Sequence, residues 1–139
     1  MTHASREIPA LVNPAAGTAD AARDALSASD SFVVREVEPA RLENAVRDVV
    51  GRGAPRVLVA GGDGTIAVAA SVLFESNTEL AILPGGTLNH FASDLGISTD
   101  PATALELAAT GTCRNVDVGM VNGRLFLNTS SVGAYVHFV

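Results

Sequence analysis

The sequence is poor in residue types on which several classes of protein depend. Its 139 residues include no tryptophan, one cysteine and only 4% aromatic residues. With Cys113 alone, no disulfide can form within the chain, and no Cys/His cluster has the spacing of a zinc site. We expect Cys113 to be a small buried apolar residue. The composition therefore excludes a disulfide-stapled domain and a common zinc module.

Basic residues and long apolar runs are also scarce. Nine Lys and Arg residues stand against 15 Asp and Glu, which gives a net charge of −6. Such a balance argues against non-specific nucleic-acid binding and against a broad electrostatic membrane-docking face. No apolar run approaches the roughly 20 residues of a transmembrane helix, and residues 1–10 lack the apolar core of a signal peptide. We therefore expect a cytoplasmic protein with no transmembrane segment and no nucleic-acid partner.

Apolar residues, by contrast, make up 47% of the chain, and they occur in short runs that alternate with helix-like stretches. The runs predict strands over 8–12, 32–37, 57–60 and 80–83. The stretches between and after them predict helices over 19–28, 40–52, 65–74, 88–95 and 101–109. Strands that alternate with helices form parallel sheets with right-handed crossovers. The predicted fold is α/β, a three-layer, doubly wound, mostly parallel sheet.

The end of the chain has a different pattern. Two further strands, over 114–121 and 125–131, are joined by Asn122-Gly123, a strong type I′ hairpin signal. Residues 132–139 are rich in apolar side chains, and the last residue, Val139, is itself apolar. We expect the whole chain, 1–139, to be one domain cut from a longer protein, and the apolar tail to favour a homodimer.

The segment Gly61-Gly62-Asp63-Gly64-Thr65 carries the clearest chemistry. It lies between a buried strand and a helix, where glycines can adopt positive φ and let the backbone approach a ligand. Free N–H groups at a helix start bind phosphate, and the Thr65 hydroxyl can donate to a phosphate oxygen. Asp63 would be repelled by phosphate. We predict that it binds Mg²⁺ or accepts a proton from an attacking hydroxyl, and the structural alternative is a helix cap.

Two more loops follow strands and should lie at the same edge of the sheet. Loops after the carboxyl ends of parallel strands gather on one side, where ligands bind. Three such loops together indicate a ligand site much more specifically than one loop does. For Asn13 and Asn89, an alternative role is to brace the loop in which each lies. The predicted nucleotide-binding residues in these two loops are Asn13, Pro14, Ala15, Ala16 and Gly17 in the first, and Gly85, Gly86, Thr87 and Asn89 in the second.

In order and spacing, the three motifs resemble the diacylglycerol kinase catalytic domain, a family that includes bacterial lipid kinases, sphingosine kinases and ceramide kinases. They read Asn-Pro-x-x-Gly at 13–17, Gly-Gly-Asp-Gly-Thr at 61–65 and Pro-Gly-Gly-Thr-x-Asn at 84–89. The resemblance covers nearly the whole chain. It implies that the chain is the N-terminal nucleotide-binding domain of such a kinase, with a fold that NAD kinases share. It also implies ATP and Mg²⁺ as cofactors, and a C-terminal β-rich domain that completes the lipid site.

Some positions depart from the family pattern. Ala67 and Val68 stand where Asn-Glu is usual, Asp20 lies near the place of a basic residue, and His90 replaces an acid. His90 can substitute for a hydrogen bond of that acid or respond to pH, and a purely structural role is the alternative.

The sequence predicts an ATP-dependent lipid kinase that phosphorylates diacylglycerol or a related lipid at a membrane surface. On its own this chain should be poorly active or inactive. The alternatives are a NAD-kinase-like enzyme for a soluble nucleotide and an inactive nucleotide-sensing module.

Overall fold

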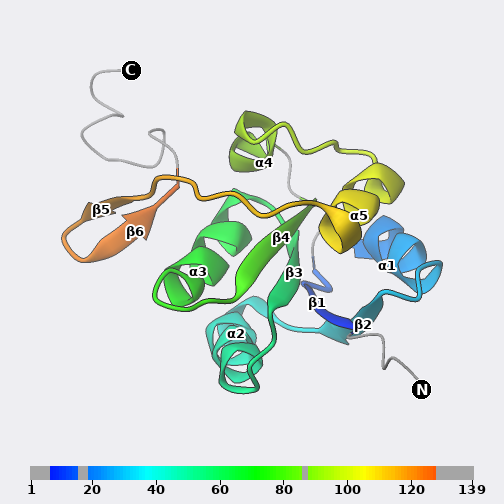
Figure 1. The fold of residues 1–139 in the computed structure, drawn as a ribbon, viewed down its shortest axis with the longest axis horizontal. Coiled ribbons are helices and arrows are strands. Elements are labelled where there is room, and N and C mark those ends of the chain that lie inside the picture. The colour runs from blue at the N-terminus through cyan, green and yellow to red at the C-terminus, as the bar shows by residue number, and fades with distance from the viewer. Residues whose placement is uncertain (1–6, 16–18, 86–87, 128–139) are drawn as a thin grey trace.

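Four parallel strands form one sheet, in the order β2-β1-β3-β4 (Figure 1). The structure is a computed structural model that describes residues 7–15, 19–85 and 88–127. The strands are β1 (Ile8–Val12), β2 (Phe32–Glu36), β3 (Arg56–Gly61) and β4 (Glu79–Pro84). The predicted parallel sheet is confirmed, because all three pairs of neighbouring strands run in the same direction.

Helices cover both faces of this sheet. The helices are α1 (Ala19–Ser27), η1 (Pro39–Arg41), α2 (Leu42–Gly51), α3 (Asp63–Leu73), α4 (His90–Asp94) and α5 (Pro101–Thr110). Helices α2 and α3 pack together on one face, and α1 and α5 pack together on the other. The three-layer, doubly wound architecture is therefore confirmed.

Alternation along the strands supplies the two layers of the core. In β3, Val57 and Val59 pack with residues of α2 and α3, whereas Leu58 and Ala60 pack with residues of α1 and α5. All four are almost fully buried. A strand buried on both faces is continuously apolar, because successive side chains point to opposite sides.

The strand order creates a switch point between β1 and β3. From β1 the chain proceeds through α1 to β2 at one edge, and from β3 it proceeds through α3 to β4 at the other edge. The loops after β1 and β3 therefore leave in opposite directions and open a crevice at the carboxyl ends of the strands. In open α/β sheets, ligands bind at such a crevice.

The hairpin forms where the sequence predicts it, with shorter strands. The strands β5 (Gly119–Val121) and β6 (Arg124–Phe126) pair antiparallel, and Asn122 and Gly123 both have positive φ, as a type I′ turn requires. Residues 111–118 form no strand. The prediction of a buried Cys113 is wrong, because this residue is exposed. The predicted dimer contact through the tail falls on residues outside the described part of the chain.

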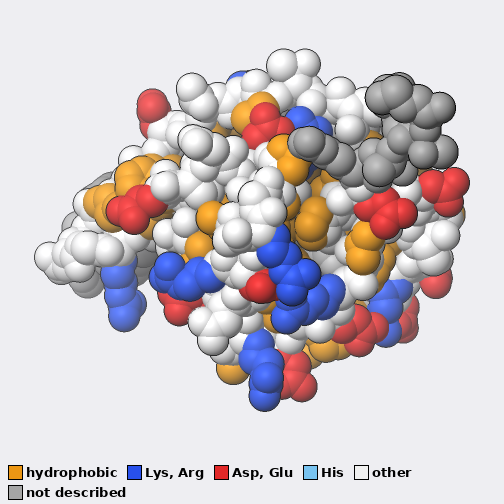
Figure 2. Space-filling model, turned by 60° about the horizontal axis from the view of Figure 1, so that its bottom comes forward, with side chains coloured by type: hydrophobic (Ala, Val, Ile, Leu, Met, Phe, Trp, Pro, Cys, Tyr) orange, Lys and Arg blue, Asp and Glu red, His pale blue; other side chains and the backbone are white. Residues whose placement is uncertain are grey.

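Charged side chains alternate in sign on the face that Figure 2 shows. Ion pairs also lie along α2: Asp48 pairs with Arg35 and Arg52, and Glu43 pairs with Arg47. The distances between their charged atoms are 3.2–3.5 Å. Such exposed pairs each contribute little to stability.

Candidate nucleotide site

The turn from β3 into α3 is tight because of a close contact between Gly61 and Thr65. A Cβ atom at position 61 would lie 2.7 Å from Cβ and Cγ2 of Thr65, so only glycine fits without a shift. The predicted positive φ is wrong for this turn, because among the described glycines only Gly53, Gly96 and Gly123 have positive φ. The requirement at Gly61 is space for the Thr65 side chain.

Helix α3 begins two residues earlier than the sequence predicts. Its N-cap is Gly62, which has no side chain to accept from the first turn, and Asp63 is the first helical residue. The amides of Asp63, Gly64 and Thr65 meet no acceptor within the described part of the chain. A helix start with free N–H groups favours an anion, because the helix dipole adds positive charge there.

A cavity of about 110 Å³ joins the first and second motifs. Asn13 on one side and Gly64 and Thr65 on the other contribute its polar lining, and the remaining lining residues are Leu11, Val37, Pro39, Leu42 and Val68. The Asn13 carboxamide accepts from the amide of Ala15 at 2.9 Å and so also braces its own loop. Pro14 and Ala15 lie in that turn, while Ala16 and Gly17 are outside the described residues.

The third motif lies beside the second. The register of β3 and β4 places Pro84 next to Gly61, and the Gly85 amide donates to the Gly61 carbonyl at 2.9 Å. Asn89 adopts a left-handed conformation, with φ 48° and ψ 48°, and is the N-cap of α4. Gly86 and Thr87 are outside the described residues. The structure thus brings the described parts of all three motifs to one edge of the sheet.

Asp63 makes two hydrogen bonds that the sequence does not reveal. Its Oδ2 accepts from the amide of His90 at 2.9 Å, and its Oδ1 accepts from the amide of Phe91 at 3.0 Å. The imidazole Nδ1 of His90 lies 4.0 Å from Oδ2. The side chain of Asp63 remains 34% exposed. The predicted alternative of a helix cap therefore applies to this residue, although the capped helix is α4 rather than its own.

Side chains for a metal ion are few at this edge. Within the described ranges, no three His, Cys, Asp or Glu side chains come together as a metal site. Mg²⁺ usually keeps several waters and is held by one or two carboxylates together with substrate phosphates. The single Asp63 carboxylate is compatible with such a shared site, but it does not form a protein-only one.

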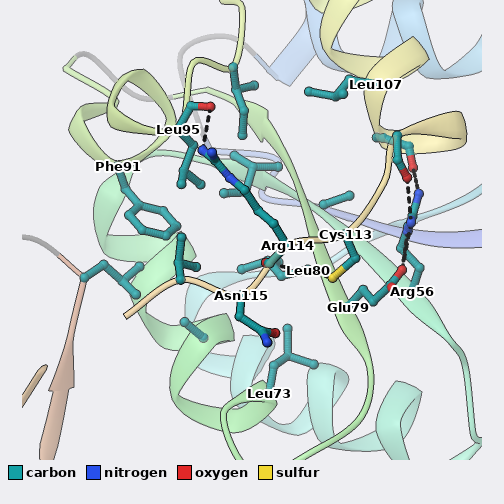
Figure 3. A pocket seen from close by; sticks show the side chains of 18 of the residues that line it. Arg56, Leu73, Glu79, Leu80, Phe91, Leu95, Leu107, Cys113, Arg114 and Asn115 are labelled. Carbon is teal, nitrogen blue, oxygen red and sulfur yellow. Dashed lines mark hydrogen bonds and ion pairs between the residues drawn. The ribbon is translucent and has the colours of Figure 1, made fainter. Parts of the chain in front are cut away.

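A larger cavity lies elsewhere and was not predicted. It has a volume of about 640 Å³ and extends along the free edge of β4, between α3, α5 and residues 111–118. Phe91 and Leu95 lie at one end and the Arg56–Glu79 ion pair lies at the other (Figure 3). None of the described motif residues in 13–15, 61–65 and 84–89 lines it. It is therefore separate from the candidate nucleotide site.

The polar end of this cavity is organised by Arg56. The Arg56 guanidinium donates to Glu79 and to the carbonyls of Ala108 and Gly111, at 2.8–3.0 Å. The hydrogen bond from Arg56 holds the pKa of Glu79 below its usual value. Partial burial of the sulfur, and then the Glu79 carboxylate, raise the pKa of the Cys113 thiol. These contacts hold α5 against the sheet, at the end opposite to the three motifs.

Comparison with known proteins identifies the family. The model of the diacylglycerol kinase catalytic domain matches residues 8–121, which include all three motifs. The chain belongs to this family. A diacylglycerol kinase from Bacillus anthracis strain Sterne has a similar structure, with a TM-score of 0.76 and 28% sequence identity. The match covers 88% of this chain and 48% of that protein.

Related sequences carry lipid kinase names. A "Probable lipid kinase YegS-like" protein of Pseudomonas aeruginosa (strain UCBPP-PA14) is 43% identical over 90 residues, which are 63% of this chain and 30% of that protein. A protein of the same name from Klebsiella pneumoniae (strain 342) is 42% identical over 80 residues, which are 55% of this chain and 27% of that protein. The matched part of the chain therefore spans less than a third of the length of these relatives.

Proposed function

We propose that this chain is the nucleotide-binding part of an ATP-dependent lipid kinase, which transfers the γ-phosphate of ATP to a hydroxyl of diacylglycerol or a related lipid. The observation that carries the proposal is the convergence of three motif loops at the switch point of the sheet, next to the uncapped start of α3. The relatives are named lipid kinases and diacylglycerol kinases, which supports a lipid as the acceptor.

Backbone groups are the main phosphate ligands in this proposal. The amides at the start of α3 and the Thr65 hydroxyl would donate to phosphate oxygens. The three motifs contain no Lys or Arg. Mg²⁺, when bound, would neutralise part of the phosphate charge, and Asp63 is the carboxylate within the motifs that could hold it. The transfer breaks the bond between the γ-phosphorus and the bridging oxygen, forms a bond to the lipid oxygen, and releases ADP and a proton.

The small cavity would hold only part of the nucleotide. Pockets that enclose a drug-sized ligand have volumes of about 300–1,000 Å³, whereas this cavity measures about 110 Å³. The part next to the phosphates would lie against Val68 and the other apolar walls, and the rest would lie over the open edge of the sheet.

The lipid acceptor places the reaction at a membrane surface in this proposal. No helix in the described part of the chain is long and apolar enough to span a bilayer. The proposed contact with the membrane is peripheral, with a cytoplasmic location as the sequence suggests. A homodimer is proposed as well, through the apolar residues after 131.

Calorimetry on the 139-residue chain tests the nucleotide half of the proposal. With Mg²⁺ present, the chain should bind ATP more tightly than NAD. The isosteric Thr65→Val variant loses one hydrogen bond to a charged group, so its Kd should rise about tenfold or more. Thr99→Val, at an exposed position, is the matched control. Absence of ATP binding would refute the proposal, and tighter binding of NAD would favour a NAD-kinase-like enzyme.

Transfer of the γ-phosphate tests the lipid half. In the protein at its full natural length, labelled ATP should yield a labelled lipid with phosphatidylcholine vesicles that contain diacylglycerol, and none with vesicles that lack it. Labelling of a soluble acceptor in place of the lipid would refute this half.

A further inference from the structure

Helix α4 begins without a cap from its own N-cap residue. Asn89 occupies that position in a left-handed conformation, and its side chain accepts no hydrogen bond from the helix. The amides of His90 and Phe91 donate instead to the two carboxylate oxygens of Asp63, from a different motif. We propose that Asp63 is a positioning residue, whose carboxylate clasps the third motif to the second and so shapes the nucleotide site. This inference rests on the proposed function of the site.

Both ends of the clasp are anchored in the core. Asp63 is the first residue of α3, and Ile66 in the same helical turn is 3% exposed. Phe91, which supplies one of the two amides, is 6% exposed and belongs to the same apolar cluster as Ile66. The carboxylate therefore joins two segments that are each packed into the core.

A second link acts in parallel with the carboxylate. The Gly85 amide donates to the Gly61 carbonyl at 2.9 Å, immediately before the third motif continues toward α4. The third motif is therefore tied to the second at both of its ends, by Gly85 on one side and by α4 on the other. Removal of the carboxylate would leave the Gly85 link and the packing of Phe91 in the core.

The clasp also bears on the charge of Asp63. Two N–H donors at the start of α4 compensate the carboxylate, which would otherwise repel nucleotide phosphates. Each carboxylate oxygen already accepts one hydrogen bond, and a carboxylate has about four lone-pair positions in all. These two contacts are sufficient for a role in positioning.

Amide hydrogen exchange of the chain without nucleotide tests the clasp directly. In Asp63→Ala, the amides of His90 and Phe91 should exchange about tenfold faster or more, as expected for loss of a hydrogen bond to a charged group. Asp63→Asn keeps one acceptor oxygen, so one of the two amides should stay protected. Asp94→Asn, an exposed carboxylate on the same helix, should leave both amides unchanged. Unchanged exchange in both Asp63 variants would overturn the proposal.

Nucleotide affinity with and without Mg²⁺ distinguishes positioning from metal binding. If Asp63 positions the third motif, Asp63→Asn should weaken ATP binding by a similar factor in Mg²⁺ and in EDTA. A loss of affinity that occurs in Mg²⁺ and is absent in EDTA would overturn the proposal and assign Asp63 to the metal. If the wild-type chain binds no nucleotide, the proposed function fails, while the exchange measurement still decides whether the clasp exists.

Discussion

Replacement of Gly64 by alanine should stabilise the fold and weaken nucleotide binding at the same time. Gly64 lies in the first turn of α3, and a Cβ atom at this position would meet nothing within 4 Å. Its φ is not positive, so alanine can adopt the same backbone conformation. Gly64 also lines the small cavity of the candidate nucleotide site. A methyl group there would occupy the approach of a phosphate and touch no protein atom.

The expected gain in stability follows from helix propensity and chain entropy. Alanine is favoured over glycine by about 1 kcal/mol in a helix interior, and a compatible Gly→Ala change stabilises by about 0.4–1 kcal/mol. For a first-turn position we expect the free energy of unfolding to rise by about 0.5 kcal/mol. In a domain of this size, that change raises Tm by about 1–3 °C.

The expected loss of affinity follows from the amide contacts. If the methyl group holds a phosphate away from one amide of the first turn, the loss equals one hydrogen bond to a charged group, about 1.5–3 kcal/mol. The Kd for ATP should then rise about tenfold to hundredfold. Circular dichroism on heating gives the first quantity, and calorimetric titration gives the second.

Two other glycines separate the effects. Gly51→Ala, at the end of α2, also has open space around its Cβ and should give a gain in stability with unchanged affinity for ATP. Gly61→Ala should lower both the stability of the fold and the affinity for ATP. Its Cβ would lie 2.7 Å from Thr65, and such overpacking costs about 1–3 kcal/mol. If Gly64→Ala binds ATP as tightly as the wild type, the phosphate does not approach the start of α3, and the proposed site is wrong.

Two further predictions concern α5. Arg56→Met removes the hydrogen bonds to Ala108 and Gly111 from a side chain that is only 19% exposed. The free energy of unfolding, measured in urea, should fall by about 1.5–3 kcal/mol. For the exposed control Arg52→Met it should fall by less than about 0.5 kcal/mol. Hydrogen bonds from Thr103 lower the pKa of Asp100, the one from its hydroxyl more than the one from its amide. The stabilisation by this cap is therefore present above the unfolded pKa and is lost as the pH falls through the lower folded pKa. Thermal unfolding between about pH 5 and pH 2 should therefore be less pH-dependent in Asp100→Asn than in the wild type; equal pH dependence would contradict this assignment.

The sheet could be predicted because its signals are local. Continuous apolar runs such as 57–60 are typical of strands buried on both faces, and the helices between them leave a parallel sheet as the simple arrangement. The start of α5 is equally local: Pro101 preceded by Thr99 or Asp100 predicts a capped helix start. In the structure Asp100 is the cap, since its carboxylate accepts from the Thr103 amide at 3.1 Å. The convergence of the three motifs follows from the parallel sheet, since it requires only that the loops share one edge.

Features that depend on distant contacts could not be predicted. The 640 Å³ cavity results from the way residues 111–118 pass the free edge of β4 without forming a strand beside it. The exposure of Cys113 has the same origin, because a residue in that segment has no partner strand to cover it. Glycine motifs likewise suggest positive φ, whereas the structure uses the missing Cβ of Gly61 to admit Thr65.

Asp63 shows why motifs taken one at a time are incomplete. A carboxylate in a phosphate-binding loop is unfavourable because it repels phosphate. For that reason the sequence suggests a metal or a proton as its partner. Its partners in the structure are backbone amides, 27 and 28 residues further along the chain, at the start of α4. No side chain marks these donors, so the sequence carries no local sign of them. The second and third motifs then act as one unit: the third supplies the donors that compensate the acid of the second, and the acid sets the position of the third.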